Sequence, residues 1–165
     1  VGNRVTRFQP GDEVFANCSG AFAEYVAVGE DQLAPKPANL TCAQAAAVPM
    51  AGLTALQCLR DAGRLQPGQK VLINGASGGV GAFAVQIAKA LGAEVTGVCS
   101  TRNVDMVRAL GADHVIDYTK EDFTAGGRRY DRILDKVANH SFSDLRRAPT
   151  PQGPIIPDSG QGGMG

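Results

Sequence analysis

The chain has 165 residues, and its 16 Lys and Arg balance 16 Asp and Glu, so the formal net charge is zero. Without an excess of positive charge, we expect neither a nucleic acid nor an anionic membrane surface as a partner. Apolar runs such as residues 45–48 are far shorter than the roughly 20 residues that cross a bilayer. The first residues show no basic flank before an apolar core, so we expect a cytoplasmic protein.

The four cysteines are scattered along the chain. They are Cys18, Cys42, Cys58 and Cys99. None forms a Cys-x-x-Cys pair, and neither histidine lies near one at metal-ligand spacing. We therefore expect four reduced thiols that pack within the fold, and no metal site.

The first forty residues are typical of β structure. Short apolar runs lie within residues 11–16, 21–28 and 32–37, and they are separated by Gly and Pro. This pattern predicts three short strands.

After Leu40 the pattern changes to helix and strand in alternation. Thr41 is a candidate N-cap for a short Ala-rich helix, and a second helical segment follows up to Gly63. Four β-branched runs come next, each followed by a polar turn and a helical segment. They lie at residues 70–74, 94–99, 114–117 and 132–135. The alternation predicts an α/β fold with a parallel sheet and right-handed crossovers, and a last weak strand between Pro154 and Pro157 at its edge.

A glycine cluster at residues 75–81 lies between the apolar strand at 71–74 and a helical pattern. The apolar residues of that pattern recur from Val80 to Leu91 with the spacing of one helix face, and Gly92 ends it. Residues without a Cβ let the backbone turn sharply and approach a diphosphate, whose charge meets free N–H groups at the helix start. The strand, loop and helix together predict a dinucleotide-binding site.

The cluster departs from the fingerprint G-x-G-x-x-G. Gly78 and Gly81 occupy its second and third positions, whereas Ala76 occupies the first and Gly75 lies beside it. One alternative is a glycine-rich turn that binds nothing. A phosphate loop of the NTPase kind is disfavoured, because no Gly-Lys-Ser or Gly-Lys-Thr follows.

The end of the next strand lacks a carboxylate. In a fold that binds NAD, an Asp or Glu at this place binds the ribose 2′-hydroxyl. Here the strand at 94–99 is followed by Ser100, Thr101 and Arg102. Two hydroxyls and a guanidinium suit a 2′-phosphate, so we expect NADP(H) as the cofactor. The alternative is that Ser100 and Thr101 cap the following helix while Arg102 is a solvated surface charge.

Five segments, in this order and spacing, resemble one known family. They read GDEVFANCSGAFAEYVAV, AAAVPMAGLTALQCL, VLINGASGGVGAFAVQIAKALGA, LGADHVIDYTKEDF and YDRILDKVAN. The chain is similar over nearly its whole length to the zinc-independent branch of the medium-chain dehydrogenase/reductases, the NADPH:quinone oxidoreductases.

The resemblance implies two domains. Residues 1–43 correspond to the β-rich C-terminal part of a GroES-like catalytic domain, and residues 44–165 to a Rossmann domain, a doubly wound parallel sheet cut before its last strand. In this family the last strand commonly forms the dimer edge. We therefore expect a homodimer for the full-length protein and no activity from this piece alone.

The resemblance also implies the cofactor-binding residues. Five residues of the glycine cluster are assigned to the pyrophosphate, and the others to the adenosine or nicotinamide side. They are Thr54, Ser77, Gly78, Gly79, Val80, Gly81, Ser100, Arg102, Tyr118 and Asn139. The residue pattern leaves other roles open at three places: Tyr118 as a packing residue, Thr54 as a polar helix residue, and Ala138 where many relatives have Gly.

Zinc ligands are missing where zinc-dependent relatives have them. Those relatives place a Cys four residues before the Thr at position 54, and here Met50 occupies that position. They also insert a lobe with four Cys after the strand at 11–16, where this chain has Cys18 alone. Both zinc sites are therefore expected to be absent.

The function that the resemblance implies is hydride transfer from NADPH to a small-molecule acceptor, a quinone or an α,β-unsaturated carbonyl. Neither the acceptor's identity nor a catalytic residue is specified by the sequence. Two alternatives stay open. A non-catalytic NADP(H)-binding module would bind NADPH without consuming it, and a relative of the zinc-type alcohol dehydrogenases would contain bound zinc.

Overall fold

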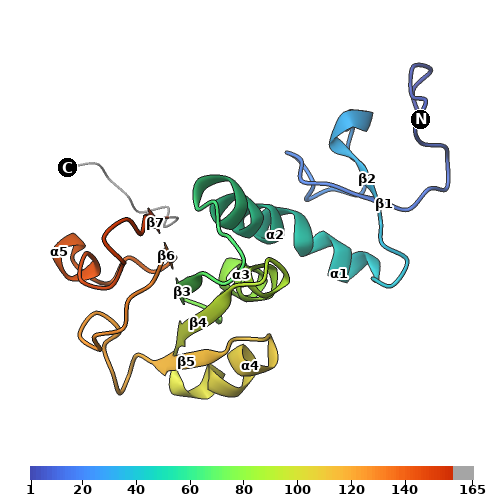
Figure 1. Ribbon diagram of the computed structural model, residues 1–165. Coiled ribbons are helices and arrows are strands. Elements are labelled where there is room, and N and C mark those ends of the chain that lie inside the picture. The colour runs from blue at the N-terminus through green and yellow to red at the C-terminus, as the bar shows by residue number, and fades with distance from the viewer. Residues whose placement is uncertain (158–165) are drawn as a thin grey trace. The chain divides into compact units, whose positions relative to one another are not determined.

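The computed structural model describes residues 1–157 (Figure 1). The chain divides into two compact units, with Leu53 as the last residue of the first and Thr54 as the first residue of the second. None of the helices in residues 1–157 is long and apolar enough to cross a membrane. The assignment of residues 1–43 to a GroES-like domain stays a prediction.

The first unit contains little regular structure. Strand β1 (Val14–Phe15) pairs antiparallel with β2 (Ala34–Pro35), and a 3₁₀ turn (Glu30–Gln32) precedes β2. The strand expected at residues 21–28 does not form. A strand needs a hydrogen-bonded neighbour, and none of the described residues lies alongside this run, whose Phe22 and Tyr25 are 109% and 91% exposed.

The first of the helices that follow begins where the sequence predicts, whereas the second begins earlier than the segment expected up to Gly63. Thr41 is the N-cap of α1 (Cys42–Ala46), and its side chain forms a capping box with Gln44. Helix α2 (Val48–Leu56) continues into a π-helical segment (Gln57–Ala62), for which Gly63 is the C-cap.

A five-stranded parallel sheet forms the centre of the second unit. Its strands are β3 (Lys70–Asn74), β4 (Glu94–Cys99), β5 (His114–Asp117), β6 (Arg132–Asp135) and β7 (Ile155–Pro157). They lie in the order β5-β4-β3-β6-β7, so the chain moves outward from β3 first in one direction and then in the other. In such a doubly wound sheet, ligands bind outside the carboxyl ends of the strands where the direction reverses. The expected Rossmann fold is confirmed, with the weak last strand at the edge.

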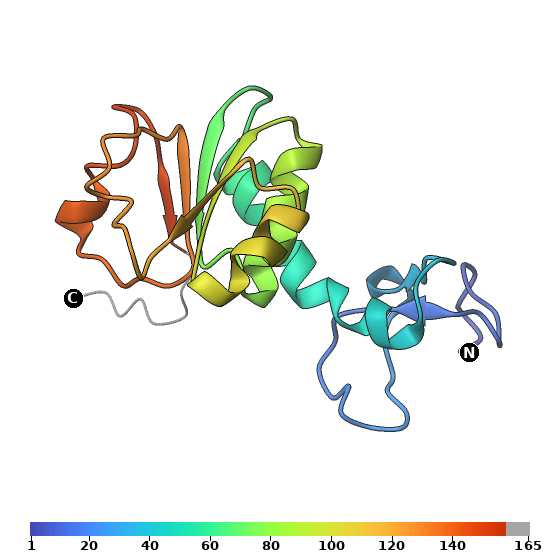
Figure 2. The ribbon, with the colours of Figure 1, turned by 90° about the horizontal axis from the view of Figure 1, so that it is seen from below.

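Helices cover both faces of this sheet. Helix α3 (Gly79–Ala90) follows β3, and α4 (Val104–Ala109) follows β4 after a 3₁₀ turn (Thr101–Asn103). Both lie on one face, whereas the short α5 (Phe142–Leu145) lies on the other (Figure 2). At the end of α3, Gly92 adopts a φ of +80°, as expected for a residue that ends a helix.

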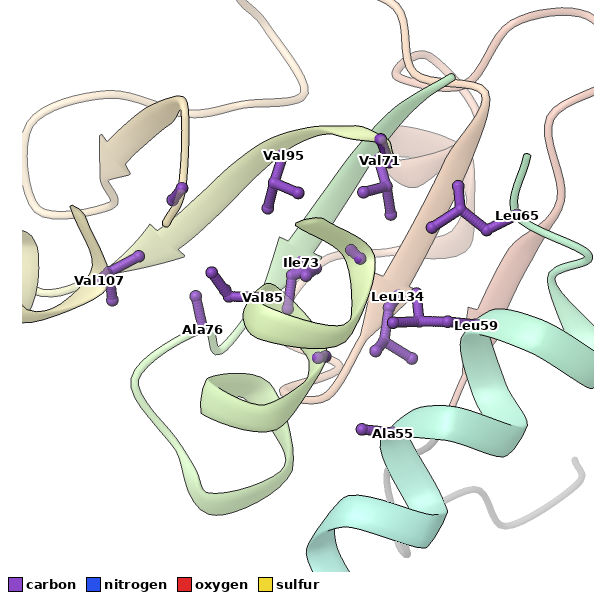
Figure 3. Close-up of a cluster of buried hydrophobic side chains, with 14 of the residues drawn as sticks. Ala55, Leu59, Leu65, Val71, Ile73, Ala76, Val85, Val95, Val107 and Leu134 are labelled. Atoms are coloured by element: carbon purple, nitrogen blue, oxygen red, sulfur yellow. The ribbon is translucent and has the colours of Figure 1, made fainter. Parts of the chain in front are cut away.

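Two clusters of buried side chains hold these layers together. In the larger one, Val85 of α3 and Leu59 of the π-helical segment lie against Ile73 and Leu134 of the sheet (Figure 3). The smaller one, on the opposite face, includes Leu72, Ile133 and Leu145. Because β3 is covered on both sides, its residues Val71–Ile73 form a continuous apolar run rather than an alternating one.

One expected helix is absent. The segment between β5 and β6, residues 118–131, contains turns and no helix. The carboxylate of Asp122 accepts hydrogen bonds from the backbone and side chain of Thr124, and Gly127 adopts a φ of +69°. These local turns compete with a helix, and so the helical prediction for this segment was wrong.

Candidate functional site

A cavity of about 640 Å³ lies at the carboxyl ends of β3, β4 and β6. Its lining comes from the glycine loop, the turn after β4, the residue after β5 and the loop after β6. The lining residues are Asn74, Gly75, Ser77, Gly78, Gly79, Val80, Gly81, Val98, Cys99, Ser100, Arg102, Asn103, Tyr118, Lys136, Val137 and Asn139. The structure therefore brings together every predicted site residue except Thr54 and Thr101.

The glycine loop brings the backbone close to the cavity. Gly75 has a φ of +85°, in the left-handed region that side chains disfavour, and a Cβ there would lie 2.9 Å from Val137 Cγ2. A Cβ on Gly81 would collide with the carbonyl oxygen of Gly75, so α3 packs against the loop only because residue 81 is a glycine.

The N-terminus of α3 is open to the cavity. Its N-cap is Gly78, which provides no side-chain hydrogen bond, and a Cβ on Gly79 would meet nothing within 4 Å. The first N–H groups of a helix have no partner within the helix and carry its positive partial charge. These N–H groups and the surrounding glycines fit a pyrophosphate, as a dinucleotide requires.

The turn after β4 supplies polar groups without a carboxylate. Ser100 and Arg102 line the cavity, and the exposed Arg102 side chain forms no hydrogen bond or ion pair with any residue among 1–157. Ser100 precedes the 3₁₀ turn without a side-chain capping bond. Ser100 is the N-cap residue of the turn by position, but its side chain does not make the capping bond that the alternative expects.

Thr101 does not line the cavity, and its side chain contacts a different strand. Its hydroxyl donates a 2.6 Å hydrogen bond to the carboxylate of Asp117 at the end of β5, and lies 3.1 Å from the Thr119 hydroxyl. Hydrogen bonds from Thr101 and Thr119 hold the pKa of Asp117 well below its usual range, so the carboxylate is charged near neutral pH. The prediction that Thr101 contributes to the cofactor site is not supported by its position.

Thr54 lies in α2 and does not line the cavity. The sequence placed Thr54 there only by resemblance, and no spacing argument supported it. Tyr118 does line the cavity, and its side chain is 56% exposed. This exposure argues against the packing role that the sequence left open for Tyr118.

The loop after β6 is fixed by a buried carboxylate. Asp135 is 3% exposed, and its Oδ1 accepts hydrogen bonds from Asn74 Nδ2 at 2.9 Å and from the backbone N–H groups of Val137 and Ala138 at 3.1 and 3.0 Å. Asn74 Nδ2 also donates to Asn139 Oδ1 at 3.0 Å. Asn139 is thereby held at the rim of the cavity by residues from two adjacent strands.

Sequence reasoning missed several lining residues, including Asn74, Cys99 and Asn103. Asn74 and Cys99 are the last residues of β3 and β4. Their place at the carboxyl ends of parallel strands, where ligands bind in such a sheet, could have identified them as lining residues. Burial raises the pKa of the Cys99 thiol, so this residue is a neutral packing group. All four cysteines are free, but only Cys99 is buried, and the exposed Cys42 does not fit the expected packing role.

Within residues 1–157, no group of three or more His, Cys, Asp and Glu side chains lies close enough together to hold a metal ion.

The chain is similar to known oxidoreductases. Residues 79–156 match the family model described as zinc-binding dehydrogenase. The chain is 45% identical to the mitochondrial NAD(P)H oxidoreductase RTN4IP1 of Mus musculus over 147 residues, which cover 82% of this chain and 37% of that protein. It is 38% identical to the chloroplast envelope quinone oxidoreductase homolog of Arabidopsis thaliana over 169 residues, which cover 94% and 51%.

A solved structure agrees with these relatives. The quinone oxidoreductase of Coxiella burnetii superposes with a TM-score of 0.85 at 35% identity, over 94% of this chain and 50% of that one. The chain thus spans about half, or less, of the length of the relatives it matches. The glycine loop, the strand order and these likenesses lead to one conclusion: the chain belongs to the medium-chain dehydrogenase/reductase family, as do the quinone oxidoreductases it resembles.

Proposed function

We propose that the protein transfers a hydride from NADPH to a quinone or an α,β-unsaturated carbonyl without a zinc ion. One observation carries the proposal. The cavity combines a glycine loop for a pyrophosphate with a turn that has Ser100 and Arg102 in place of an acid. A free guanidinium suits a phosphate, whereas a carboxylate would suit the unphosphorylated ribose of NADH.

Each part of the cavity then has a role in binding. The N–H groups at the start of α3, with Ser77, bind the pyrophosphate, and Ser100 and Arg102 bind the 2′-phosphate. Tyr118 lies beside the adenine, and Asn139 approaches the cofactor from the β6 side. Once bound, the nicotinamide supplies the hydride, and the protein supplies orientation and the exclusion of water.

The choice of acceptor is supported by the named relatives and by the missing zinc ligands. Two of the similar proteins are named as quinone oxidoreductases or their homologs. Met50 occupies the place where zinc-dependent members of the family have a Cys ligand. Without a Lewis acid to polarise a carbonyl, hydride transfer favours an acceptor such as a quinone or an enone, which accepts a hydride more readily.

The proposal is tested with the full-length protein. NADPH consumption is followed by absorbance with a quinone, an enone or a simple aldehyde as the acceptor, and alcohol oxidation is followed as the reduction of NADP⁺. NADH is the comparison cofactor, and the zinc content is measured in the same sample. Faster turnover with NADPH and a quinone or enone, without stoichiometric zinc, supports it. Stoichiometric zinc with alcohol oxidation would favour the zinc-type dehydrogenase instead, and NADPH binding without turnover would favour a non-catalytic module.

A further inference from the structure

Asn103 joins two serines of the cavity. Its side-chain Nδ2 donates to the Ser77 hydroxyl oxygen at 3.2 Å and to the Ser100 hydroxyl oxygen at 3.1 Å. Ser77 belongs to the glycine loop after β3, whereas Ser100 directly follows β4. One amide therefore connects the loop assigned to the pyrophosphate with the turn assigned to the 2′-phosphate, and all three residues line the same cavity.

Asn103 makes these contacts instead of capping its own helix. It occupies the N-cap of α4, where an Asn side chain usually accepts a hydrogen bond from a backbone N–H of the first turn. No such capping bond is present at Asn103. The side-chain hydrogen bonds of Asn103 run to two residues that line the cavity and not to its own helix, which points to a role in the cavity.

The direction of these hydrogen bonds decides where the serine protons point. A side-chain NH₂ group has two hydrogens, and a serine hydroxyl has one O–H donor and two acceptor lone pairs. Each serine oxygen accepts from Asn103, so each O–H stays available as a donor. Neither hydroxyl donates to another side chain or backbone group within residues 1–157.

We propose that Asn103 is a positioning residue that directs the hydroxyl protons of Ser77 and Ser100 toward the phosphate groups of NADP(H). The inference rests on the proposed function, because it assumes the cofactor named there. Two neutral O–H donors then line the same cavity as the charged Arg102 guanidinium, and all three suit phosphate oxygens. The Ser100 contribution depends on the 2′-phosphate, which NADH lacks.

The test compares cofactor binding by the intact protein and its variants, by titration calorimetry with NADPH and NADH. Asn103→Ala should raise the Kd for NADPH about five- to tenfold, and that for NADH by less than about threefold. Because Asn103 acts in part through Ser100, Asn103→Ala should raise the Kd for NADPH by a smaller factor in the Ser100→Ala variant than in the wild type. Met106→Ala, an exposed change on the same helix and outside the cavity, is the matched control.

A second variant keeps the test decisive if the alanine variant folds poorly. Asn103→Asp keeps the shape of the side chain, but its carboxylate accepts from both serines and turns their protons away from the cavity. The Kd for NADPH should then rise at least as much as in Asn103→Ala. Thermal unfolding of each variant shows whether the fold is kept.

The outcomes separate this inference from the proposed function. If wild-type protein prefers NADPH but Asn103→Ala leaves the NADPH to NADH ratio unchanged, the positioning role is wrong while the proposed cofactor stands. Additive effects of Asn103→Ala and Ser100→Ala would likewise overturn it. If the wild type prefers NADH or binds neither dinucleotide, the proposed function fails and this inference fails with it.

Discussion

The Thr101 hydroxyl donates a 2.6 Å hydrogen bond to the carboxylate of Asp117, the last residue of β5. This bond ties the turn after β4 to the end of the neighbouring strand β5, while Ser100 and Arg102 of the same turn line the cavity. The acid that is missing at the end of β4 is thus present on the adjacent strand, where hydroxyls occupy its oxygens. The Asp117 carboxylate therefore stabilises the turn through hydrogen bonds from Thr101 and Thr119.

Asp117→Asn should destabilise the protein at neutral pH and by a smaller amount in acid. The hydrogen bonds from Thr101 and Thr119 depress the folded pKa of Asp117. Its stabilising effect is therefore complete above the unfolded pKa of about 4 and is lost as the pH falls from there toward the folded pKa. Urea denaturation at pH 7 and pH 3 should show the difference between wild type and variant shrinking in acid. Asp105→Asn is the control: its side chain is 99% exposed and forms only a surface ion pair with Arg108 at 3.6 Å, so the change in stability should be small at both pH values.

Arg102→Ala should reduce the preference for NADPH over NADH. Removing the guanidinium deletes a charge-assisted contact with the 2′-phosphate, which corresponds to a change of about tenfold to a hundredfold in the ratio of dissociation constants. Binding of both cofactors, measured by titration, checks this. An unchanged ratio would show that Arg102 is only a solvated surface charge.

Gly81→Ala should destabilise the fold by about 1 to 3 kcal/mol or more, because its Cβ would collide with backbone atoms of Gly75 and Ala76 that cannot move aside cheaply. Gly79→Ala is the matched comparison two residues earlier in the same helix. Its Cβ would meet nothing within 4 Å, so this variant should keep or slightly raise the free energy of unfolding. Equal stability of the two variants would contradict the tight approach of α3 to the loop.

Ala138→Gly should stabilise the loop after β6. Ala138 has a φ of +54°, a left-handed conformation that costs a residue with a Cβ about 1 to 2 kcal/mol. Part of the gain is lost to the greater freedom of Gly in the unfolded chain, so a net increase of up to about 1 kcal/mol is expected. Ala138→Val should have the opposite effect on the denaturation midpoint. A loss of stability in the glycine variant would show that the left-handed backbone is not strained.

The sheet and the glycine loop could be predicted because their signals are local. The apolar run at residues 71–74, the helical stripe from Val80 and the stop at Gly92 each depend on neighbours in the chain. The same reasoning failed at residues 21–28, because a β-like pattern becomes a strand only beside a partner. Local pattern could not supply that partner.

The contacts that arrange the site could not be predicted from spacing. Asn74 and Asp135 are 61 residues apart and meet because β3 and β6 are adjacent and in register. Thr101 was expected in the cofactor site from its neighbours Ser100 and Arg102, but the packing of β5 beside β4 brings Asp117 within its reach. Side-chain direction in a short turn depends on such tertiary neighbours.

The absence of a helix between β5 and β6 determines where the second unit should first exchange its amide hydrogens with solvent. Residues 118–131 bond largely to their own turns, with Phe123 and Tyr130 as buried anchors. The central strands, by contrast, are hydrogen-bonded on both sides. Amides of this segment should therefore lose protection by local opening at a free energy well below that of global unfolding. Tyr118, whose backbone N–H donates to the carbonyl of Cys99 in β4, is the point at which this segment reaches the cavity, so local opening is expected to begin beyond it.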